Sequence, residues 1–365
     1  MFLVVTRNFP PDIGGIQSLM GGLSEGLLEH GPVKVFANEF NHSDKYDKKS
    51  SLNIERIKGI KLFRKYRKAN IVNNFISKNA NIRAIFADHW KSLELLKTEF
   101  LNKTKTFCLL HSKEINHEIN SSLNKRLIKS TNKANFIIAN SNFTKDLAIK
   151  VGIDKSKLHV IFPGISKPKI IDHSSIDEAK KTFDKSFPKI ITVARLDKRK
   201  GHDKILMLIK NLKTQYPKIK YISVGFGDEE SSLLALSKEL SLEKEVIFLK
   251  NIKENLKLAL IAESDFFLMP SRKEKKSIEG FGISFMEAAS YGTPSIGGSY
   301  GGASDAISHN KTGLICDGNE LNSIHDAVTE ILNDKKFINF GKSAKQFSEN
   351  FDWNKVVKNY LKLIN

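Results

Sequence analysis

The stretch EGFGISFMEAASYGTP, residues 279–294, decides the fold of this chain. Two glycines near its start indicate a flexible loop, its middle favours a helix, and the closing Gly-Thr-Pro ends that helix. Short apolar runs at residues 265–269 and 294–296 flank the stretch and predict buried strands. Because a strand, a helix and a second strand form the repeating unit of a parallel sheet, we expect such a sheet here.

The same alternation of apolar, β-branched runs with longer amphipathic stretches occurs along the whole chain. The predicted strands are residues 2–6, 33–38, 82–87, 106–111, 135–140 and 159–162 in the first half, and 189–194, 220–225, 246–249, 265–269, 294–296 and 313–316 in the second. Such runs are typical of parallel strands that helices cover on both faces. Because the alternation occurs twice, we predict an α/β protein with two Rossmann-like domains.

The length agrees with two domains, since 365 residues exceed the size at which one hydrophobic core usually stops growing. The polar residues 165–187 show little apolar periodicity and are interpreted as a linker. We therefore expect an N-terminal domain at residues 1–170 and a C-terminal domain at residues 180–350. Apolar residues at helical spacing predict a final helix within residues 351–365.

Composition narrows the choice of compartment and partner. The net charge of +19 favours an anionic partner, either nucleic acid, anionic lipid or a phosphorylated substrate, although a genome biased toward Lys, Asn and Ile produces the same excess. No nucleic-acid recognition module is visible, so we expect no nucleic-acid partner. With no signal peptide and no apolar run long enough for a bilayer, we expect a cytoplasmic protein. The two cysteines, Cys108 and Cys316, lie in apolar runs and are predicted to be buried thiols.

Basic and apolar side chains mix in KGIKLFRKYRK, the segment from Lys58 to Lys68. Such a segment suits an anionic membrane surface, where each cation contributes about 1 kcal/mol. A strand followed by the solvated start of a basic helix explains it nearly as well. A lipid or lipid-linked acceptor, with peripheral attachment to the inner face of the cytoplasmic membrane, is therefore a hypothesis.

The glycine pair Gly14-Gly15 lies between the first predicted strand and a helix that begins near Ile16. Backbone N–H groups of adjacent glycines approach an anion closely, and the helix N-terminus adds partial positive charge. A phosphate fits against Gly15, although a simple turn is the commoner use of such a pair. The fingerprint G-x-G-x-x-G is absent here, which argues against an NAD-type enzyme.

Two cations, Arg195 and Lys200, follow the strand predicted at residues 189–194. A guanidinium and an ammonium at this place are able to bind a pyrophosphate leaving group and assist its departure. Their location at the carboxyl end of a strand favours this role over that of a solvated loop. Their neighbours Lys198 and Arg199 are expected to be solvated.

The opening stretch contains two carboxylates, Glu279 and Glu287. Along a helix they would lie about 12 Å apart. Hydrolytic carboxylate pairs lie roughly 5–9.5 Å apart, so a glycosidase pair is disfavoured. Glu287 suits a vicinal diol such as ribose, and Glu279 suits a sugar hydroxyl beside the glycine loop.

His111 ends an apolar strand, a position that favours a site role over a structural one. The glycine-rich residues 297–305 form either a second phosphate loop or a turn. The chain contains no Asp-x-Asp, through which many sugar transferases bind a divalent ion, so we expect no metal and no other cofactor.

In this order the motifs resemble those of the retaining glycosyltransferases of family 4, which have the GT-B fold with two parallel sheets facing each other across a cleft. The resemblance covers almost the full chain and rests on FPP and GGIQ within residues 9–17, VARL at 193–196, EGFG at 279–282, the E-x7-E spacing of the glutamates, and NKTGL at 310–314. The branch it resembles most is that of the phosphatidylinositol mannosyltransferase-like enzymes. The loop KEKKSI at 273–278 and the residues after His111 depart from that branch, which leaves the acceptor open.

The resemblance implies a donor site for a nucleotide diphosphate sugar, linked to GDP or UDP. Arg195 and Lys200 would bind the diphosphate with a backbone N–H of Gly15, and Glu287 would bind the ribose. The final helix would cross back onto the N-terminal domain.

The resemblance also implies the catalytic residues of a transfer that retains the anomeric configuration. Glu279 would contact the transferred sugar, near the loop N–H groups of Phe281, Gly282 and Ile283, and His111 would lie near the reaction centre. Arg195 and Lys200 would share in catalysis by stabilising the leaving diphosphate.

Two other classes stay open: a nucleotide-sugar epimerase of the same fold, and a non-catalytic protein that binds sugar nucleotides. An epimerase would convert the donor without releasing nucleoside diphosphate. The sequence does not determine the base, the sugar, the linkage, or whether the acceptor is a lipid or a glycan.

Overall fold

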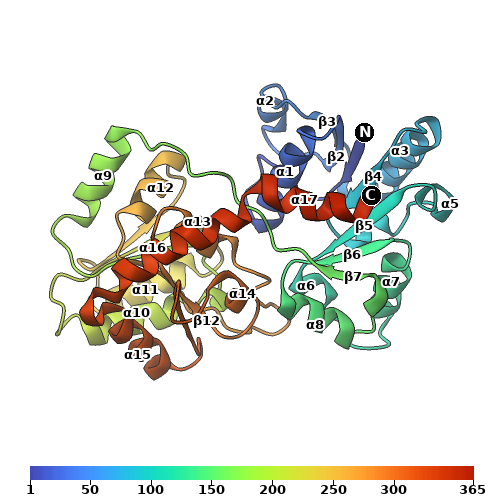
Figure 1. Ribbon diagram of the computed structural model, residues 1–365. Coiled ribbons are helices and arrows are strands. Elements are labelled where there is room, and N and C mark those ends of the chain that lie inside the picture. Colours follow the sequence, from blue (N-terminus) through green and yellow to red (C-terminus); the bar gives the residue numbers. More distant parts are fainter. The chain divides into compact units, whose positions relative to one another are not determined.

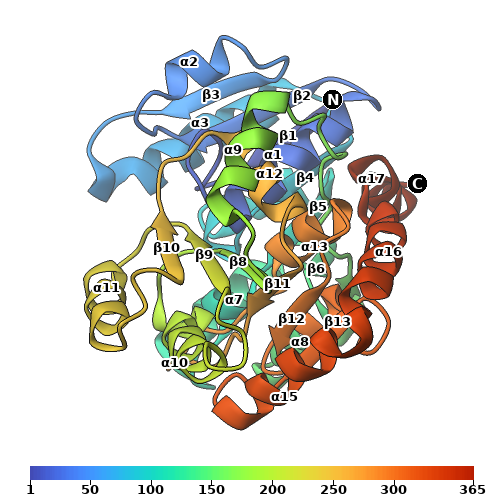
Figure 2. The same cartoon turned by 90° about the vertical axis from the view of Figure 1, so that its left-hand side faces the viewer.

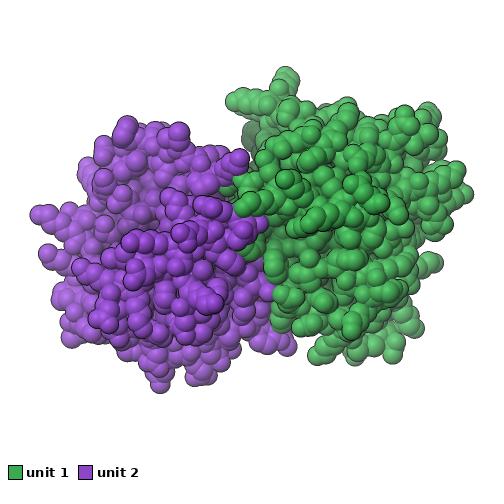
Figure 3. All heavy atoms as spheres, viewed as in Figure 1, with its two compact units in different colours: residues 1–166, 351–365 green, residues 167–350 purple.

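The computed structural model describes residues 1–365, which form two compact units (Figures 1 and 3). Unit 1 comprises residues 1–166 and 351–365, and unit 2 comprises residues 167–350. The C-terminal residues therefore belong to the same unit as the N-terminus. No helix combines the length and the apolar character needed to cross a bilayer.

Unit 1 is built on seven parallel strands in the order β3-β2-β1-β4-β5-β6-β7. The strands are β1 (Phe2–Val5), β2 (Val33–Asn38), β3 (Asn53–Ile57), β4 (Ala84–Ala87), β5 (Lys105–Leu110), β6 (Phe136–Ala139) and β7 (Leu158–Val160). The helices are α1 (Gly15–Leu28), α2 (Ser43–Asp47), η1 (Lys61–Phe63), α3 (Arg64–Lys78), α4 (Trp90–Leu93), α5 (Thr98–Leu101), α6 (Ser112–Ile115), α7 (Ser122–Thr131), α8 (Asn142–Lys150), η2 (Lys155–Lys157), η5 (Glu349–Phe351, whose last residue belongs to this unit) and α17 (Trp353–Ile364). The sequence does not predict β3, because this edge strand is mostly polar and only Ile57 is fully buried.

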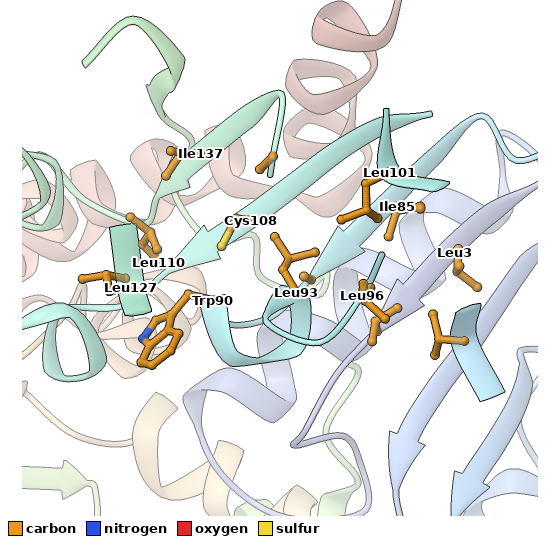
Figure 4. Packing of buried hydrophobic residues seen from close by; sticks show 14 of the residues in the cluster. Leu3, Ile85, Trp90, Leu93, Leu96, Leu101, Cys108, Leu110, Leu127 and Ile137 are labelled. Atoms are coloured by element: carbon orange, nitrogen blue, oxygen red, sulfur yellow. The ribbon is translucent and has the colours of Figure 1, made fainter. Parts of the chain in front are cut away.

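The core of unit 1 lies against its parallel sheet. Figure 4 shows Leu3, Ile85 and Cys108 from neighbouring strands beside Trp90 and Leu93 of α4, all of them buried. Each strand contributes alternate side chains to this face, as the period of two in a strand requires. Cys108 is a free, buried thiol, as the sequence predicts.

The predicted final helix is confirmed as α17, and it packs on α1. A Cβ atom on Gly22 would lie 2.0 Å from Nε1 of Trp353, and one on Gly26 would lie 2.8 Å from Cγ2 of Val357. The glycines of α1 thus form the surface against which the apolar side of α17 packs. This contact explains why the last residues belong to unit 1.

Unit 2 is built on six parallel strands in the order β10-β9-β8-β11-β12-β13, side by side in Figure 2. The strands are β8 (Lys189–Val193), β9 (Lys220–Val224), β10 (Val246–Leu249), β11 (Phe266–Met269), β12 (Ser295–Gly298) and β13 (Gly313–Cys316). The helices are α9 (His173–Phe183), η3 (Lys198–Lys200), α10 (His202–Leu212), α11 (Glu230–Glu239), α12 (Glu254–Ala262), α13 (Ile283–Ser290), α14 (Ala303–Ala306), α15 (Leu321–Leu332), η4 (Asn333–Lys335) and α16 (Lys336–Ser348). Cys316 is also free and buried.

The interpretation of residues 165–187 as a linker is wrong, because α9 lies within them. Asp172 caps this helix by accepting a hydrogen bond from the Ser175 N–H at 2.8 Å. Ala179 and Phe183 are fully buried, so a sparse apolar stripe was enough to fix the helix on unit 2.

Both sheets reverse their strand order at one point, between β1 and β4 in unit 1 and between β8 and β11 in unit 2. Open parallel sheets bind ligands outside the carboxyl ends of their strands at such a switch point. The loops after these four strands are therefore the positions at which this fold binds ligands.

Candidate active site

The loops that follow β8 and β11 meet at the switch point of unit 2. Gly201 ends η3 with a φ of 78°, and a Cβ atom there would lie 2.6 Å from the Pro270 carbonyl oxygen. The backbone N–H of Arg272 donates to the Arg199 carbonyl at 2.9 Å. Only glycine allows both the left-handed conformation and this close approach.

Glu279 lies at the centre of a buried ionic cluster. Its Oε2 accepts hydrogen bonds from Lys200 Nζ and from Arg199 Nη1, each at 2.5 Å. The three side chains are about one-tenth exposed. Burial alone would raise the pKa of Glu279, but Lys200 and Arg199 outweigh it and lower that pKa to about 2. Glu279 is therefore an anion at any physiological pH.

The expectation that Arg199 is solvated is wrong. Arg199 is buried, and its Nη2 also lies 3.6 Å from Asp197 Oδ2. Three consecutive basic residues, of which Arg199 is the second, are typical of a solvated loop. The sequence did not indicate its burial because the carboxylate that binds it, Glu279, is distant in the chain. The expectation holds for Lys198, which is exposed.

Arg195 differs from Arg199 in its exposure, because its side chain is 65% exposed while its Nη2 lies 3.6 Å from Asp197 Oδ2. Its backbone is anchored instead: Leu196 is buried, and the buried His202 ring contacts the Arg195 carbonyl through Nε2 at 3.2 Å. Burial lowers the pKa of His202 to about 4, so the ring is neutral at pH 7. The exposed guanidinium is available to an anionic ligand.

Glu287 lies on α13 and is bound by a lysine that the sequence analysis did not single out. Lys257 Nζ lies 2.8 Å from Glu287 Oε1 and 3.1 Å from Glu254 Oε1. Burial disfavours the charged ammonium, but the two carboxylates raise the pKa of Lys257 overall. A lone lysine within the otherwise apolar end of α12 was the available signal. The Glu287 side chain is 29% exposed and so remains accessible.

The glycine loops support this part of unit 2. Gly282, with a φ of 88°, precedes the first turn of α13, where Ile283 is half-buried, and Phe281 beside it is buried. The second glycine-rich loop packs against the first, since the Gly302 N–H donates to the Glu279 carbonyl at 3.0 Å. Residues 297–305 thereby brace the Glu279 backbone.

His111 lies next to the switch point of unit 1, because β5 is the neighbour of β4 in the sheet. It follows β5, is buried, and contacts the Asp88 carbonyl through Nε2 at 3.0 Å. Burial lowers the pKa of the imidazole, although the nearby Asp88 opposes that shift. Its backbone N–H donates to Glu114 Oε1, and burial raises the pKa of Glu114 to about 8. The His111 backbone thus contacts a carboxyl group that is largely protonated at pH 7.

Gly15 is the exposed first residue of α1. The segment before it is tied to β3, because Arg56 donates to the Pro10 carbonyl and binds Asp47 at 2.7 Å. The structure therefore places Lys200, Glu279 and the Arg195 backbone together in unit 2, and Gly15 and His111 in unit 1.

An open cavity of about 580 Å³ lies elsewhere in unit 2, between the turn before β13 and α16. None of the predicted site residues lines it. No group of three or more His, Cys, Asp or Glu side chains lies close enough together to bind a metal ion.

Two Rossmann-like units, each built on an open parallel sheet with a switch point, are the architecture of the GT-B fold. Family models agree: residues 13–167 match Glycosyltransferase Family 4, and residues 174–351 match Glycosyl transferases group 1. The chain belongs to this glycosyltransferase family.

Two curated relatives are similar to this chain over different lengths. The chain is 26% identical over 354 residues to the GDP-mannose-dependent alpha-(1-6)-phosphatidylinositol monomannoside mannosyltransferase of Mycobacterium tuberculosis, covering 91% of this chain and 89% of the relative. A shorter match, 34% identical over 143 residues, is to the N-acetyl-alpha-D-glucosaminyl L-malate synthase of Bacillus anthracis, covering 39% of this chain and 36% of the relative.

Solved structures share the fold. HepE of Anabaena in complex with UDP superposes with a TM-score of 0.82 at 17% identity, covering all of this chain and 99% of HepE. Sucrose-phosphate synthase from Thermosynechococcus elongatus gives a TM-score of 0.78 at 18% identity, covering all of this chain and 98% of that one. At these identities the likeness establishes the GT-B fold alone.

Proposed function

We propose that this glycosyltransferase moves a hexose, in the first instance mannose from GDP-mannose, to a lipid or lipid-linked acceptor. The Lys200–Glu279–Arg199 cluster at the switch point of unit 2 carries the proposal, because it supplies cations for a diphosphate beside a carboxylate for a sugar. The mannosyltransferase names of full-length relatives support the choice of donor and acceptor. A glycan acceptor and a UDP-linked donor are the alternatives.

The donor roles follow from charge and exposure. Arg195 and Lys200 bind the diphosphate and stabilise it as it leaves, so we propose that the transfer needs no metal. Glu287, steadied by Lys257, accepts hydrogen bonds from the ribose hydroxyls. Glu279, with the N–H groups of the loop at Phe281, Gly282 and Ile283, contacts the hexose.

Unit 1 contributes Gly15 and His111 in this proposal. The Gly15 N–H meets the diphosphate, and the His111 imidazole, whose Nε2 donates to the Asp88 carbonyl, lies near the reacting carbon without adding charge. We further propose that the new bond retains the donor's anomeric configuration, which the family resemblance supports.

An anionic membrane is the proposed source of the acceptor. Ile60, Leu62, Phe63 and Tyr66, in and beside η1 and at the start of α3, are 68%, 74%, 53% and 51% exposed. The exposed cations of the same segment are Lys58, Lys61 and Lys65. Large exposed apolar side chains among cations are typical of interfacial binding.

Lys68, which the sequence analysis included in this basic segment, does not belong to the surface. It is buried, and its Nζ donates to the Thr6 carbonyl at 2.8 Å. Flotation with phosphatidylinositol-containing vesicles tests the membrane contact: Leu62→Ser with Lys65→Ser should abolish salt-sensitive binding. Equal flotation of that variant and the wild type would contradict it.

The donor and the reaction are tested together. Purified protein is screened by thermal shift against GDP-mannose, UDP-glucose and ADP-glucose, and nucleoside diphosphate release and lipid products are measured with phosphatidylinositol vesicles. We expect stabilisation and release with GDP-mannose, both lost in Glu287→Ala. Conversion of the sugar without diphosphate release would support an epimerase instead, and binding without any conversion would support a binding protein.

A further inference from the structure

The ionic cluster of unit 2 contains more charged side chains than Lys200 and Glu279 alone. Three cations, Arg195, Arg199 and Lys200, lie with two carboxylates, Asp197 and Glu279, so the cluster has one net positive charge. Without Arg199 it would be neutral. A neutral cluster has little attraction for a diphosphate.

Lys200 and Arg199 share one oxygen of the same carboxylate. Both donate to Glu279 Oε2 at 2.5 Å, and all three side chains are about one-tenth exposed. A buried carboxylate that loses its counter-charge is strongly destabilised. If Lys200 were the only partner, it could not turn toward a ligand without leaving Glu279 unpaired.

Arg199 removes that obstacle, because its guanidinium keeps Glu279 paired when Lys200 moves. Its backbone is fixed as well, since the Arg199 carbonyl accepts the Arg272 N–H from the loop after β11. Arg199 Nε and Ser271 Oγ are buried without a hydrogen-bond partner, so the polar groups here are not fully satisfied by the protein itself.

We propose that Arg199 is a positioning residue of the donor site: it retains the Glu279 carboxylate and thereby releases Lys200 to bind the donor diphosphate. The inference rests on the proposed function and adds a residue to it. Arg199 need not touch the donor, which distinguishes it from Arg195 and Lys200.

A double-variant experiment on the full chain tests the inference, with GDP and UDP as probes and Kd measured by calorimetry. Arg199→Gln should raise the Kd about tenfold or more, because Lys200 becomes the sole partner of Glu279. Adding Glu279→Gln should restore the affinity to within about threefold of the wild type, since nothing then retains Lys200. Sugar transfer should not recover, because Glu279 is gone.

Matched controls keep the outcome readable. Lys198→Gln removes one exposed positive charge from the same loop and should change the Kd less than about twofold. Arg199→Lys keeps the charge and should recover most of the affinity. If Arg199→Gln fails to fold, the comparison of Glu279→Gln with the double variant still tests the inference. Once residue 279 is neutral, adding Arg199→Gln should change the Kd little.

Two results would overturn the inference. The first is that Arg199→Gln weakens binding no more than Lys198→Gln does. The second is that the double variant binds as poorly as Arg199→Gln alone, which would show that Arg199 contacts the ligand or only supports the fold. If the wild-type protein binds neither GDP nor UDP, the proposed function fails and the inference falls with it.

Discussion

Replacing Glu279 with glutamine should destabilise unit 2 at neutral pH. The change leaves Arg199 and Lys200 buried without the carboxylate that both bind. Breaking a buried ion pair by removing one partner costs about 3–5 kcal/mol. For a unit of this size that corresponds to a fall in Tm of about 6–20 °C.

Acid gives an independent measure of the same interaction. Because the pKa of Glu279 is lowered to about 2 from an ordinary value near 4.5, its contribution is present above pH 4.5 and is lost as the pH falls toward 2. The difference corresponds to about 3 kcal/mol. Glu279→Gln should lose this part of the acid dependence while wild type shows it.

The assay is urea denaturation followed by two signals. Far-UV circular dichroism reports both units, whereas tryptophan emission reports unit 1, because both tryptophans, Trp90 and Trp353, lie in it. Glu279→Gln should move the dichroism transition and leave the tryptophan transition nearly unchanged. The exposed Glu243→Gln is the control and should move neither. Identical dichroism midpoints for Glu279→Gln and wild type at pH 7 would refute the assignment of Glu279 as a buried, paired anion.

Three further perturbations test other parts of the molecule. Gly22→Ala should destabilise unit 1 by about 1–3 kcal/mol, because the added Cβ would lie 2.0 Å from Nε1 of Trp353. Urea denaturation followed by tryptophan emission measures this change. An unchanged midpoint would contradict the packing of α17 on α1. The pKa of Glu114 is raised to about 8, so its contribution to the stability of unit 1 is full below about pH 4.5 and is lost as the pH rises toward 8. Glu114→Gln should therefore reduce the decline of unit 1 stability between pH 5 and 7 by about 2 kcal/mol. Parallel pH profiles of the variant and the wild type would count against this prediction. The pKa of His202 is lowered to about 4, so its contribution to the stability of unit 2 is full above about pH 6.5 and is lost as the pH falls toward 4. His202→Gln should therefore remove about 2–3 kcal/mol of acid destabilisation from the dichroism transition. If the variant and the wild type lose stability equally in acid, the ring is not a buried, neutral imidazole.

The sequence by itself determined the fold class and the family. Apolar runs with a period of two and helices with a period of 3.6 are local patterns, so the strands of both parallel sheets were predictable except β3. That strand was missed because an edge strand buries little and keeps polar residues. The motif order, ending in the glutamates of residues 279–287, predicted the glycosyltransferase family, and the family models agree.

Only the tertiary structure decided which charges meet. Arg199 and Glu279 are 80 positions apart, and Lys257 and Glu287 are 30 apart, so no local pattern connects them. Lys68 and Arg199 belong to basic runs that are typical of solvated loops, yet both are buried because a carbonyl or a carboxylate lies where the fold places their side chains. The periodicity of apolar residues in the sequence indicates which residues face a core. The pairing of buried charges depends instead on which loops the sheet brings together at its switch point.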